Sequence, residues 1–254
     1  MANIAERQKF ILEQLKEQGY VKVSDLSRDL NASEVTIRKD LKLLEEKKLL
    51  QRSYGSASNL TSIITDKHID VKEKMQVDEK LRIARAASQL LEADDKIIIA
   101  SGTTLLAFAH AIDIREQITV ITSSVKVSLS LCYNPFIDVI QLGGTIRKNS
   151  VSVIGHYAER TLKGLSCNKL FIGVDGIDLD YGLTTSDLNE ARINQQMIAA
   201  AQETIVLTDS SKFNKRGFCK ICEIDAVHHI ITDANAPASA IKNFQERNIK
   251  VTLV

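Results

Sequence analysis

The stretch KIIIASGTT at residues 96–104 sets the class of fold for most of this chain. A short apolar, β-branched run predicts a buried strand, and the small polar residues after it predict a turn into a helix over residues 105–112. Six further runs of this kind follow, and most gaps between them can hold a helix. They are Ile118–Thr122, Phe136–Leu142, Leu170–Val174, Thr204–Thr208, His229–Thr232 and Lys250–Leu253. Strands alternating with helices predict an α/β domain around a parallel sheet, which we place at residues 79–254.

Length and composition exclude several classes of protein. The chain has 254 residues, of which 44% are hydrophobic and 26% charged, as in globular proteins of one or two domains. The chain has 33 Lys and Arg and 32 Asp and Glu, so its net charge is close to zero. A nucleic-acid partner must therefore be held by a local basic patch. No apolar run approaches membrane-spanning length, no signal-peptide pattern follows Met1, and four cysteines form no disulfide framework. We therefore expect a cytoplasmic protein with reduced thiols and no membrane partner.

The residues before position 57 have a helical pattern. Ile4, Ile11 and Leu15 recur at helical spacing and predict a first helix, with Arg7 on its opposite face. An extended piece at residues 20–23 follows. Ser24 is then expected to be the N-cap of a second helix.

A third helix and a hairpin complete this part of the chain. Ser33 is the expected N-cap, and the apolar positions of the helix are Val35, Ile37, Leu41 and Leu44. Residues 49–57 predict two short strands around a tip of small residues. This order predicts a winged helix-turn-helix at residues 1–57, with the helix-turn-helix at about 20–39, followed by a linker over residues 58–78. Such domains bind DNA, although some serve as protein-contact modules.

The recognition helix of such a domain presents its N-terminal residues to the bases of the major groove. With Ile37, Leu41 and Leu44 facing the core, polar residues remain near the outer face. An arginine there can bind guanine or clamp a phosphate, a lysine can hold a phosphate, and hairpin residues can touch the backbone or the minor groove. The predicted DNA-binding residues are Ser33, Glu34, Thr36, Arg38, Lys39, Arg52 and Tyr54.

Ligands of open parallel sheets bind at the carboxyl ends of the strands, and here those ends carry small or polar residues. A strand that turns through Gly102 into a helix suits a phosphate, although the same residues also cap helices that bind nothing. Lys212 can pair with a phosphate, and Asp175 can accept hydrogen bonds from sugar hydroxyls. The candidate ligand-binding residues at these ends are Ser101, Gly102, Thr103, Thr104, Ser123, Ser124, Asp175, Gly176 and Lys212.

Residues 182–192 allow two interpretations. In one, Ser186 or Asp187 caps a helix that carries Glu190 and Arg192 in solvent. In the other, the segment lies over the ligand site and Glu190 belongs to that site.

Two cysteines and two histidines near the C-terminus do not predict a metal site. Cys219 and Cys222 form a single pair around the apolar Ile221, and His228 and His229 are adjacent instead of at ligand spacing. No catalytic triad can be assembled from a local motif. We expect no metal and no cofactor.

Eight short motifs lie along both parts of the chain: VSDL at 23–26, TIRKDLKLLE at 36–45 and LQR at 50–52, then SGTT at 101–104, GGT at 143–145, GID at 176–178, GLT at 182–184 and DSSKF at 209–213. In this order they resemble the DeoR family of bacterial transcriptional regulators. The resemblance implies a sensor domain related in fold to ribose-5-phosphate isomerase and CoA transferases. It also implies that a phosphorylated sugar or related metabolite is sensed, and that a carbohydrate-catabolic operon is repressed until this effector binds.

Three functions compete for this sequence. A ligand-responsive repressor accounts for both domains and is our prediction, so we expect no enzymatic activity. The alternative is an enzyme similar to sugar-phosphate isomerases with an appended helix-turn-helix, in which Asp175, Glu190 and Lys212 supply acid and base groups. The third possibility is a constitutive DNA-binding protein, which binds no ligand and so does not require a pocket lined by polar residues. The predicted partners are double-stranded operator DNA, a small phosphorylated sugar and a second copy of the chain, because one recognition helix reads only a few base pairs.

Overall fold

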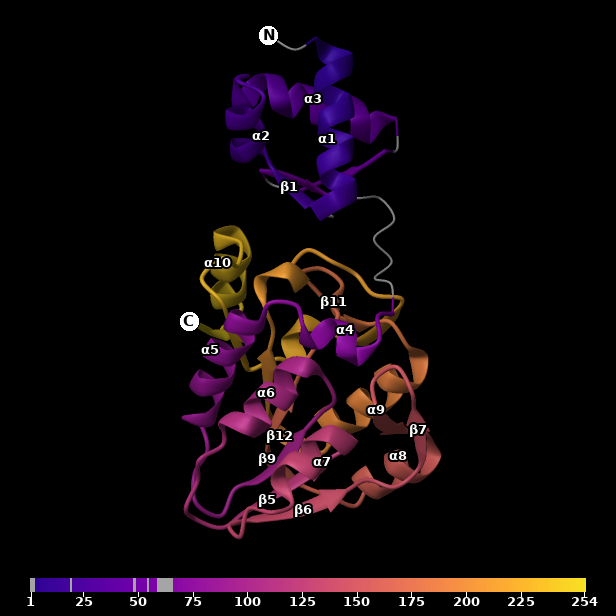
Figure 1. Cartoon of the computed structure of the whole chain (residues 1–254), viewed down its shortest axis with the longest axis vertical. Helices are drawn as coiled ribbons and strands as arrows, with labels where there is room; N and C mark the ends of the chain where they lie inside the picture. Colours follow the sequence, from indigo (N-terminus) through magenta and orange to yellow (C-terminus); the bar gives the residue numbers. More distant parts are fainter. Residues whose placement is uncertain (1–2, 19, 48, 54, 59–65) are drawn as a thin grey trace. The chain divides into compact units, whose positions relative to one another are not determined.

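The computed structural model describes residues 3–18, 20–47, 49–53, 55–58 and 66–254, and the chain forms two compact units, residues 1–62 and 63–254. The described residues of the N-terminal unit form three helices and a three-stranded antiparallel sheet of order β1-β3-β2 (Figure 1). Its elements are α1 (Ile4–Gln18), β1 (Tyr20–Lys22), α2 (Val23–Asp29), α3 (Glu34–Glu46), β2 (Gln51–Ser53) and β3 (Ser56–Ser58). The predicted winged helix-turn-helix, with β2 and β3 as its hairpin, is confirmed.

Most of the predicted helical core of this unit is buried, but two apolar residues are not. Val35 is 61% exposed, because it lies about 200° around α3 from the buried Ile37. Ile4 stands at the very start of α1 and is 49% exposed. The predicted cap at Ser24 is also wrong. Helix α2 begins at Val23, directly after strand β1, with Lys22 as its N-cap.

The C-terminal unit is built on a seven-stranded parallel sheet. Its strands are β4 (Lys96–Ile99), β5 (Ile118–Thr122), β6 (Ile137–Gln141), β9 (Cys167–Ile172), β12 (Ala201–Leu207), β14 (His229–Thr232) and β15 (Lys250–Leu253). All seven predicted runs form these strands, in the order β15-β14-β12-β9-β4-β5-β6. Every neighbouring pair is parallel, so the carboxyl ends of all the strands lie at one edge of the sheet.

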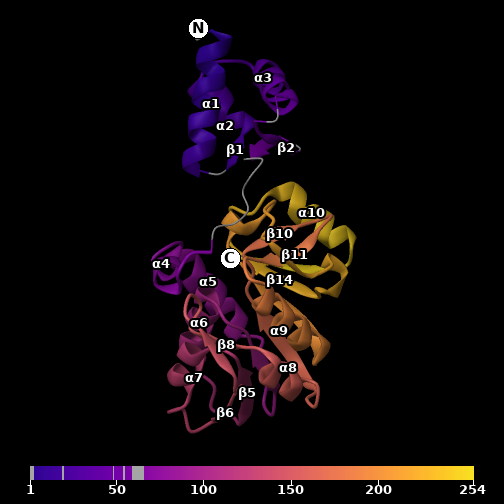
Figure 2. The ribbon, with the colours of Figure 1, turned by 90° about the vertical axis from the view of Figure 1, so that its right-hand side faces the viewer.

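Helices cover both faces of this sheet (Figure 2). The helices are α4 (Ile69–Glu73), α5 (Val77–Ser88), α6 (Thr103–Ala111), α7 (Val125–Leu131), α8 (His156–Leu162), α9 (Leu188–Ala199) and α10 (Ala238–Glu246). Ile97 and Ile99 pack with α5, α6 and α7, whereas Ile98 between them packs with α8, α9 and α10. Alternation along the strand thus buries all three isoleucines completely. No helix in the described ranges is long and apolar enough to cross a membrane.

Several short elements of this unit were not predicted. A hairpin joins β7 (Thr145–Arg147) to β8 (Ser152–Ile154), and a small antiparallel sheet contains β10 (Gly176–Asp178), β11 (Gly182–Thr185) and β13 (Cys219–Cys222). Single-turn 3₁₀ helices are η1 (Ser210–Lys212) and η2 (Ile224–Ala226). The segment from Asp66 to Gln76, which we expected in the linker, contains α4 and forms part of the cavity described below.

Candidate functional site

The start of α3 carries five of the residues predicted to contact DNA. Ser33 is the N-cap, as predicted, and its hydroxyl accepts a hydrogen bond from the Thr36 N–H at 3.2 Å. The Thr36 hydroxyl lies 2.9 Å from Ser33 Oγ, so these two residues also hold the first turn of the helix. Glu34, Arg38 and Lys39 are exposed and accessible to a partner.

The Arg38 guanidinium is paired within its own helix. Its Nη2 lies 2.6 Å from Glu34 Oε2, and both side chains are about half exposed. Exposed pairs at this helical spacing contribute only about 0.3–0.5 kcal/mol, so a guanine or a phosphate can compete for Arg38. The neighbouring Val35, predicted in the core, is an exposed apolar side chain of a kind that contacts thymine methyl groups.

The wing is tied to α3 through Arg52. The Arg52 backbone N–H donates to Glu45 Oε1 at 2.9 Å, and Nη1 lies 3.7 Å from Glu45 Oε2. The Arg52 side chain remains about one-third exposed, so part of it can still reach a DNA backbone. Tyr54, the other predicted wing contact, lies outside the described residues.

Replacing Arg38 with alanine is expected to weaken operator binding by about 1–3 kcal/mol and to relax the preference at one base pair, because a bidentate base contact is lost. Fluorescence anisotropy with duplexes changed one base pair at a time measures both effects. Arg28→Ala is the matched control, since Arg28 on α2 is also an exposed arginine paired with an acid of its own helix, Asp25. Unchanged affinity in a folded Arg38→Ala variant would exclude the base contact.

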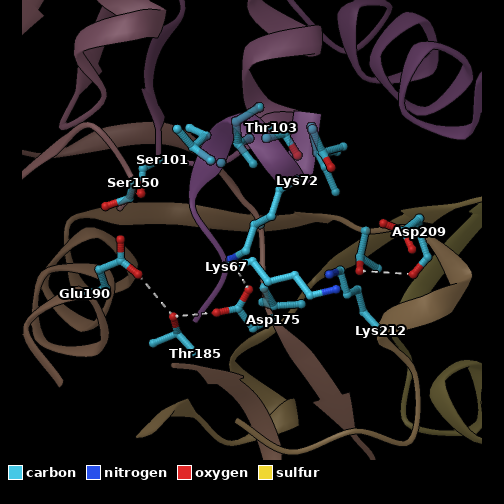
Figure 3. A pocket seen from close by; sticks show the side chains of 18 of the residues that line it. Lys67, Lys72, Ser101, Thr103, Ser150, Asp175, Thr185, Glu190, Asp209 and Lys212 are labelled. Carbon is cyan, nitrogen blue, oxygen red and sulfur yellow. Dashed lines mark hydrogen bonds and ion pairs between the residues drawn. The ribbon is translucent and has the colours of Figure 1, made fainter. Parts of the chain in front are cut away.

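A cavity in the C-terminal unit lies at the carboxyl ends of β4, β9 and β12 (Figure 3). It holds about 870 Å³ of space, including its open mouth. Other parts of its wall come from the segment Asp66–Lys80, from the β7–β8 hairpin and from the start of α9. Seven of the ten predicted effector-binding residues line it: Ser101, Gly102, Thr103, Thr104, Asp175, Glu190 and Lys212.

Three predicted effector-binding residues lie outside the lining of this cavity. Ser124 is buried and caps α7 by accepting a hydrogen bond from the Val127 N–H at 3.3 Å. The carbonyl of the buried Ser123 accepts from the Val153 N–H at 2.7 Å. Gly176 is packed so closely that an added Cβ would lie 2.4 Å from the Lys215 carbonyl oxygen. Each of these residues therefore has a structural role in the unit.

The N-terminus of α6 lines the cavity, and no side chain of the described residues caps it. Gly102 has a φ of +143°, a backbone conformation that favours glycine, and makes no side-chain cap. Thr103 and Thr104 follow in the first helical turn and line the cavity. Backbone N–H groups and hydroxyls at a helix N-terminus form a favourable environment for an anion.

Lys212 supplies a cation to the same cavity from the end of η1. The turn is fixed by Asp209, whose Oδ1 accepts a hydrogen bond from the Ser211 N–H at 3.0 Å. Among the described residues, no hydrogen bond or ion pair engages the Lys212 ammonium. In Figure 3 Lys67 also extends toward this part of the cavity. A ligand can therefore use the charge of Lys212 without breaking an existing ion pair.

Asp175 is the most heavily bonded carboxylate of the cavity. Its Oδ1 lies 2.7 Å from Lys72 Nζ, and its Oδ2 accepts from the Ser186 N–H at 3.1 Å and from the Thr185 hydroxyl at 3.2 Å. Burial by itself raises the pKa of Asp175, but the charges of Lys72 and Lys212 and the Ser186 hydrogen bond lower it below its ordinary value. Asp175 is therefore ionised and can only accept hydrogen bonds at neutral pH.

Both interpretations of residues 182–192 hold in part. Asp187 caps α9 by accepting from the N–H groups of Asn189 and Glu190, and Arg192 is exposed. Glu190 nevertheless lines the cavity, with Oε2 3.4 Å from the Thr185 hydroxyl. Burial raises the pKa of Glu190, although a hydrogen bond from Ser150 and the charge of Arg147 oppose the shift.

Sequence reasoning missed several polar residues of the cavity: Asp66, Lys67, Lys72, Lys80, Arg147, Asn149, Ser150 and Asn194. Lys80 is 6% exposed, and its ammonium donates to the carbonyl oxygens of Lys72 and Met75. Burial lowers the pKa of Lys80. No local pattern marks these residues, because they reach the cavity through packing between segments far apart in the sequence.

Cys219 and Cys222 are the first and last residues of strand β13. Residues three apart in a strand point to opposite faces, so these two thiols do not converge on one metal ion. Burial raises the pKa of Cys222 to about 11 and keeps its thiol protonated.

Comparisons with known proteins agree with this architecture. The family model for a DeoR-like helix-turn-helix domain matches residues 7–62, and the model for the DeoR C terminal sensor domain matches residues 75–234. A putative aga operon transcriptional repressor of Escherichia coli O157:H7 is 33% identical over 98% of this chain and 94% of the relative. The glycerol-3-phosphate regulon repressor of Escherichia coli K12 is 30% identical over 98% of both chains. The chain is a DNA-binding transcriptional regulator. It belongs to the DeoR family.

A distant structural likeness accompanies these matches. Ribose 5-phosphate isomerase A of Methanocaldococcus jannaschii aligns with 54% of this chain at 18% identity and a TM-score of 0.40. Both relatives described above match along nearly their whole length, and both are named repressors. The chain is thus a regulator and not an isomerase-like enzyme.

Proposed function

We propose that this protein is a cytoplasmic repressor of a carbohydrate-catabolic operon, and that a phosphorylated sugar or a related metabolite relieves the repression. The observation that carries the proposal is the meeting of two phosphate-binding features in one cavity. These are the uncapped N-terminus of α6 and the Lys212 ammonium, which has no ion-pair partner among the described residues. Asp175 lines the same cavity as an acceptor for sugar hydroxyls.

The two ends of such a ligand have different requirements. The phosphate accepts hydrogen bonds from the N–H groups at the start of α6 and from the hydroxyls of Thr103 and Thr104, while Lys212 balances its charge. The sugar hydroxyls donate to Asp175 and to Glu190, both of which are largely buried. The names of the relatives support this chemical class, since one represses an aga operon and another a glycerol-3-phosphate regulon.

Operator binding in the presence of ligands tests this proposal. A duplex selected by the protein from a random library serves as the operator, and a panel of sugar phosphates is first screened by thermal shift. A ligand at 100 times its dissociation constant stabilises the protein by about 2.7 kcal/mol. The ligand found should release the duplex in an anisotropy titration, whereas its unphosphorylated sugar should not. Operator binding that no sugar phosphate changes would instead favour a constitutive DNA-binding protein.

We further propose that the protein acts as at least a homodimer. The part of the chain that the structure describes contains one recognition helix, α3, and useful operator specificity needs two half-sites read by two related subunits. Light scattering at a protein concentration that saturates the operator should give at least twice the 28.2 kDa of one chain. A monomer alone at that concentration would contradict this expectation.

A further inference from the structure

Asp66 places a carboxylate of the chain itself inside the cavity. The Arg147 Nη2 donates to Asp66 Oδ2 in a short ion pair, and the Asn149 side-chain amide donates to the same oxygen at 2.6 Å. Ser186 Oγ lies 3.2 Å from Asp66 Oδ1, although its single proton is shared with Asp175 at 2.9 Å. Arg147 and Asn149 belong to the β7–β8 hairpin, so Asp66 reaches donors about 80 positions along the chain.

A guanidinium beside an amide is a donor set that suits a carboxylate. The Arg147 side chain is 12% exposed and is surrounded by three acids. Its contacts with Asp187 at 3.3 Å and Glu190 at 3.4 Å are longer than its contact with Asp66. Asp187 and Glu190 are fixed at the start of α9, whereas Asp66 precedes α4 and belongs to no helix or strand. Asp66 makes the closest of these three contacts, but it is also the one acid of the three that no helix holds in place, so a competing carboxylate can replace it.

We propose that Arg147 and Asn149 form a carboxylate-binding subsite that Asp66 occupies in this structure, and that an effector with an acid group opposite its phosphate competes with Asp66 for it. This inference rests on the proposed function and narrows the effector to phosphorylated sugar acids. The phosphate lies at α6 and Lys212, and the acid lies at the other wall of the same cavity.

The subsite also connects the ligand to the segment that leads to the DNA-binding unit. The C-terminal unit begins at residue 63, so Asp66 lies close to its start. Asn149 holds the same segment a second time, because its carbonyl accepts from the Ile69 N–H at 2.7 Å. Lys72, one turn further along α4, pairs with Asp175. A ligand that takes the place of Asp66 thus removes one of the contacts that hold residues 66–72, at the start of the C-terminal unit, against the cavity wall.

Chemical rescue tests the subsite without any phosphorylated ligand. In the full-length Asp66→Ala variant, acetate should bind to Arg147 and Asn149 and raise the melting temperature by roughly 2–4 °C at saturation. Acetate should not stabilise the wild type, in which Asp66 fills the subsite. Asp70→Ala is the matched control, since Asp70 pairs with Lys126 outside the cavity. Acetate is compared with chloride at equal ionic strength. No difference between Asp66→Ala and the control would overturn the subsite.

A matched pair of ligands tests the effector class. Glucitol 6-phosphate and 6-phosphogluconate share a phosphate and an open chain and differ in an alcohol or a carboxylate at carbon 1. Asp66→Asn keeps the shape of the side chain and removes its charge, so it should bind 6-phosphogluconate roughly tenfold or more tightly than the wild type does. Its affinity for glucitol 6-phosphate should stay within about twofold.

The outcomes separate the inference from the proposed function. If Asp66→Asn changes the affinity for both ligands equally, the acid of the effector does not use this subsite and the inference is wrong. If acetate rescues Asp66→Ala but no phosphorylated compound binds the wild type, the subsite stands and the proposed function fails.

Discussion

Replacing Asp40 with alanine is expected to destabilise the N-terminal unit by about 3–5 kcal/mol, the cost of removing one partner of a buried ion pair. Asp40 on α3 is 1% exposed, and it accepts from Arg7 Nε at 2.6 Å and from Arg7 Nη2 at 3.2 Å. Arg7 lies on α1 and is itself largely buried, so the pair joins two helices of the unit. Without the carboxylate, the Arg7 charge loses this balancing partner inside the unit.

Thermal unfolding of the full chain measures this effect, and operator binding reports it a second time. A loss of this size is comparable with the whole stability of a small domain, so Asp40→Ala should lose operator affinity while the C-terminal unit keeps its transition and its ligand binding. Glu46→Ala removes an exposed acid from the same helix and should change neither. An Asp40→Ala variant that melts and binds DNA like Glu46→Ala would show that the pair contributes little.

The Arg7–Asp40 pair also shows where the helical pattern misleads. From the spacing of Ile4, Ile11 and Leu15 we placed Arg7 on the outer face of α1. In the structure Ile4 is half exposed, and Arg7 turns inward to Asp40. The pattern of one helix cannot reveal this, because the partner lies 33 positions further along, on another helix.

The parallel sheet could be predicted from the sequence because both of its faces are covered. A strand segment such as Ile97–Ile99 then becomes a continuous apolar run, which is a strong signal even over three residues. The β7–β8 hairpin and the sheet of β10, β11 and β13 gave no such signal. All five of these strands are only three or four residues long, and several of them carry charged or small residues.

The candidate site was predictable to the extent that it follows the sheet. The rule that ligands bind at carboxyl ends of parallel strands located Thr103, Asp175 and Lys212, which all line the cavity. The same rule failed for Ser123, because the loop after β5 packs against β8 and not toward the cavity. It could not find Lys72, because α4 reaches the cavity from a segment that the composition indicated as a linker.

Two substitutions in the cavity should separate the recognition of the phosphate from that of the sugar. Lys212→Ala is expected to lower the affinity for every phosphorylated ligand by a similar amount, about 1.5–3 kcal/mol for a charged hydrogen bond. The Lys212 ammonium has no other partner among the described residues, so its removal should leave the fold intact. Lys242→Ala is the matched control, because Lys242 on α10 is exposed and lies outside the cavity lining.

Asp175→Asn is expected to change the ranking among sugars while inorganic phosphate binds nearly as before. The amide keeps the shape of the carboxylate but offers one oxygen in place of two and adds a donor, so hydroxyls that donate to Asp175 lose an acceptor. It also releases Lys72, which Asp175 holds at 2.7 Å, so the melting temperature of the variant is measured first.

Both variants should still bind the operator, because the recognition helix belongs to the other unit. Titration of each variant with a sugar phosphate, its unphosphorylated sugar and inorganic phosphate distinguishes the two roles. A Lys212→Ala variant that binds the phosphorylated sugar like the wild type would show that the phosphate lies elsewhere.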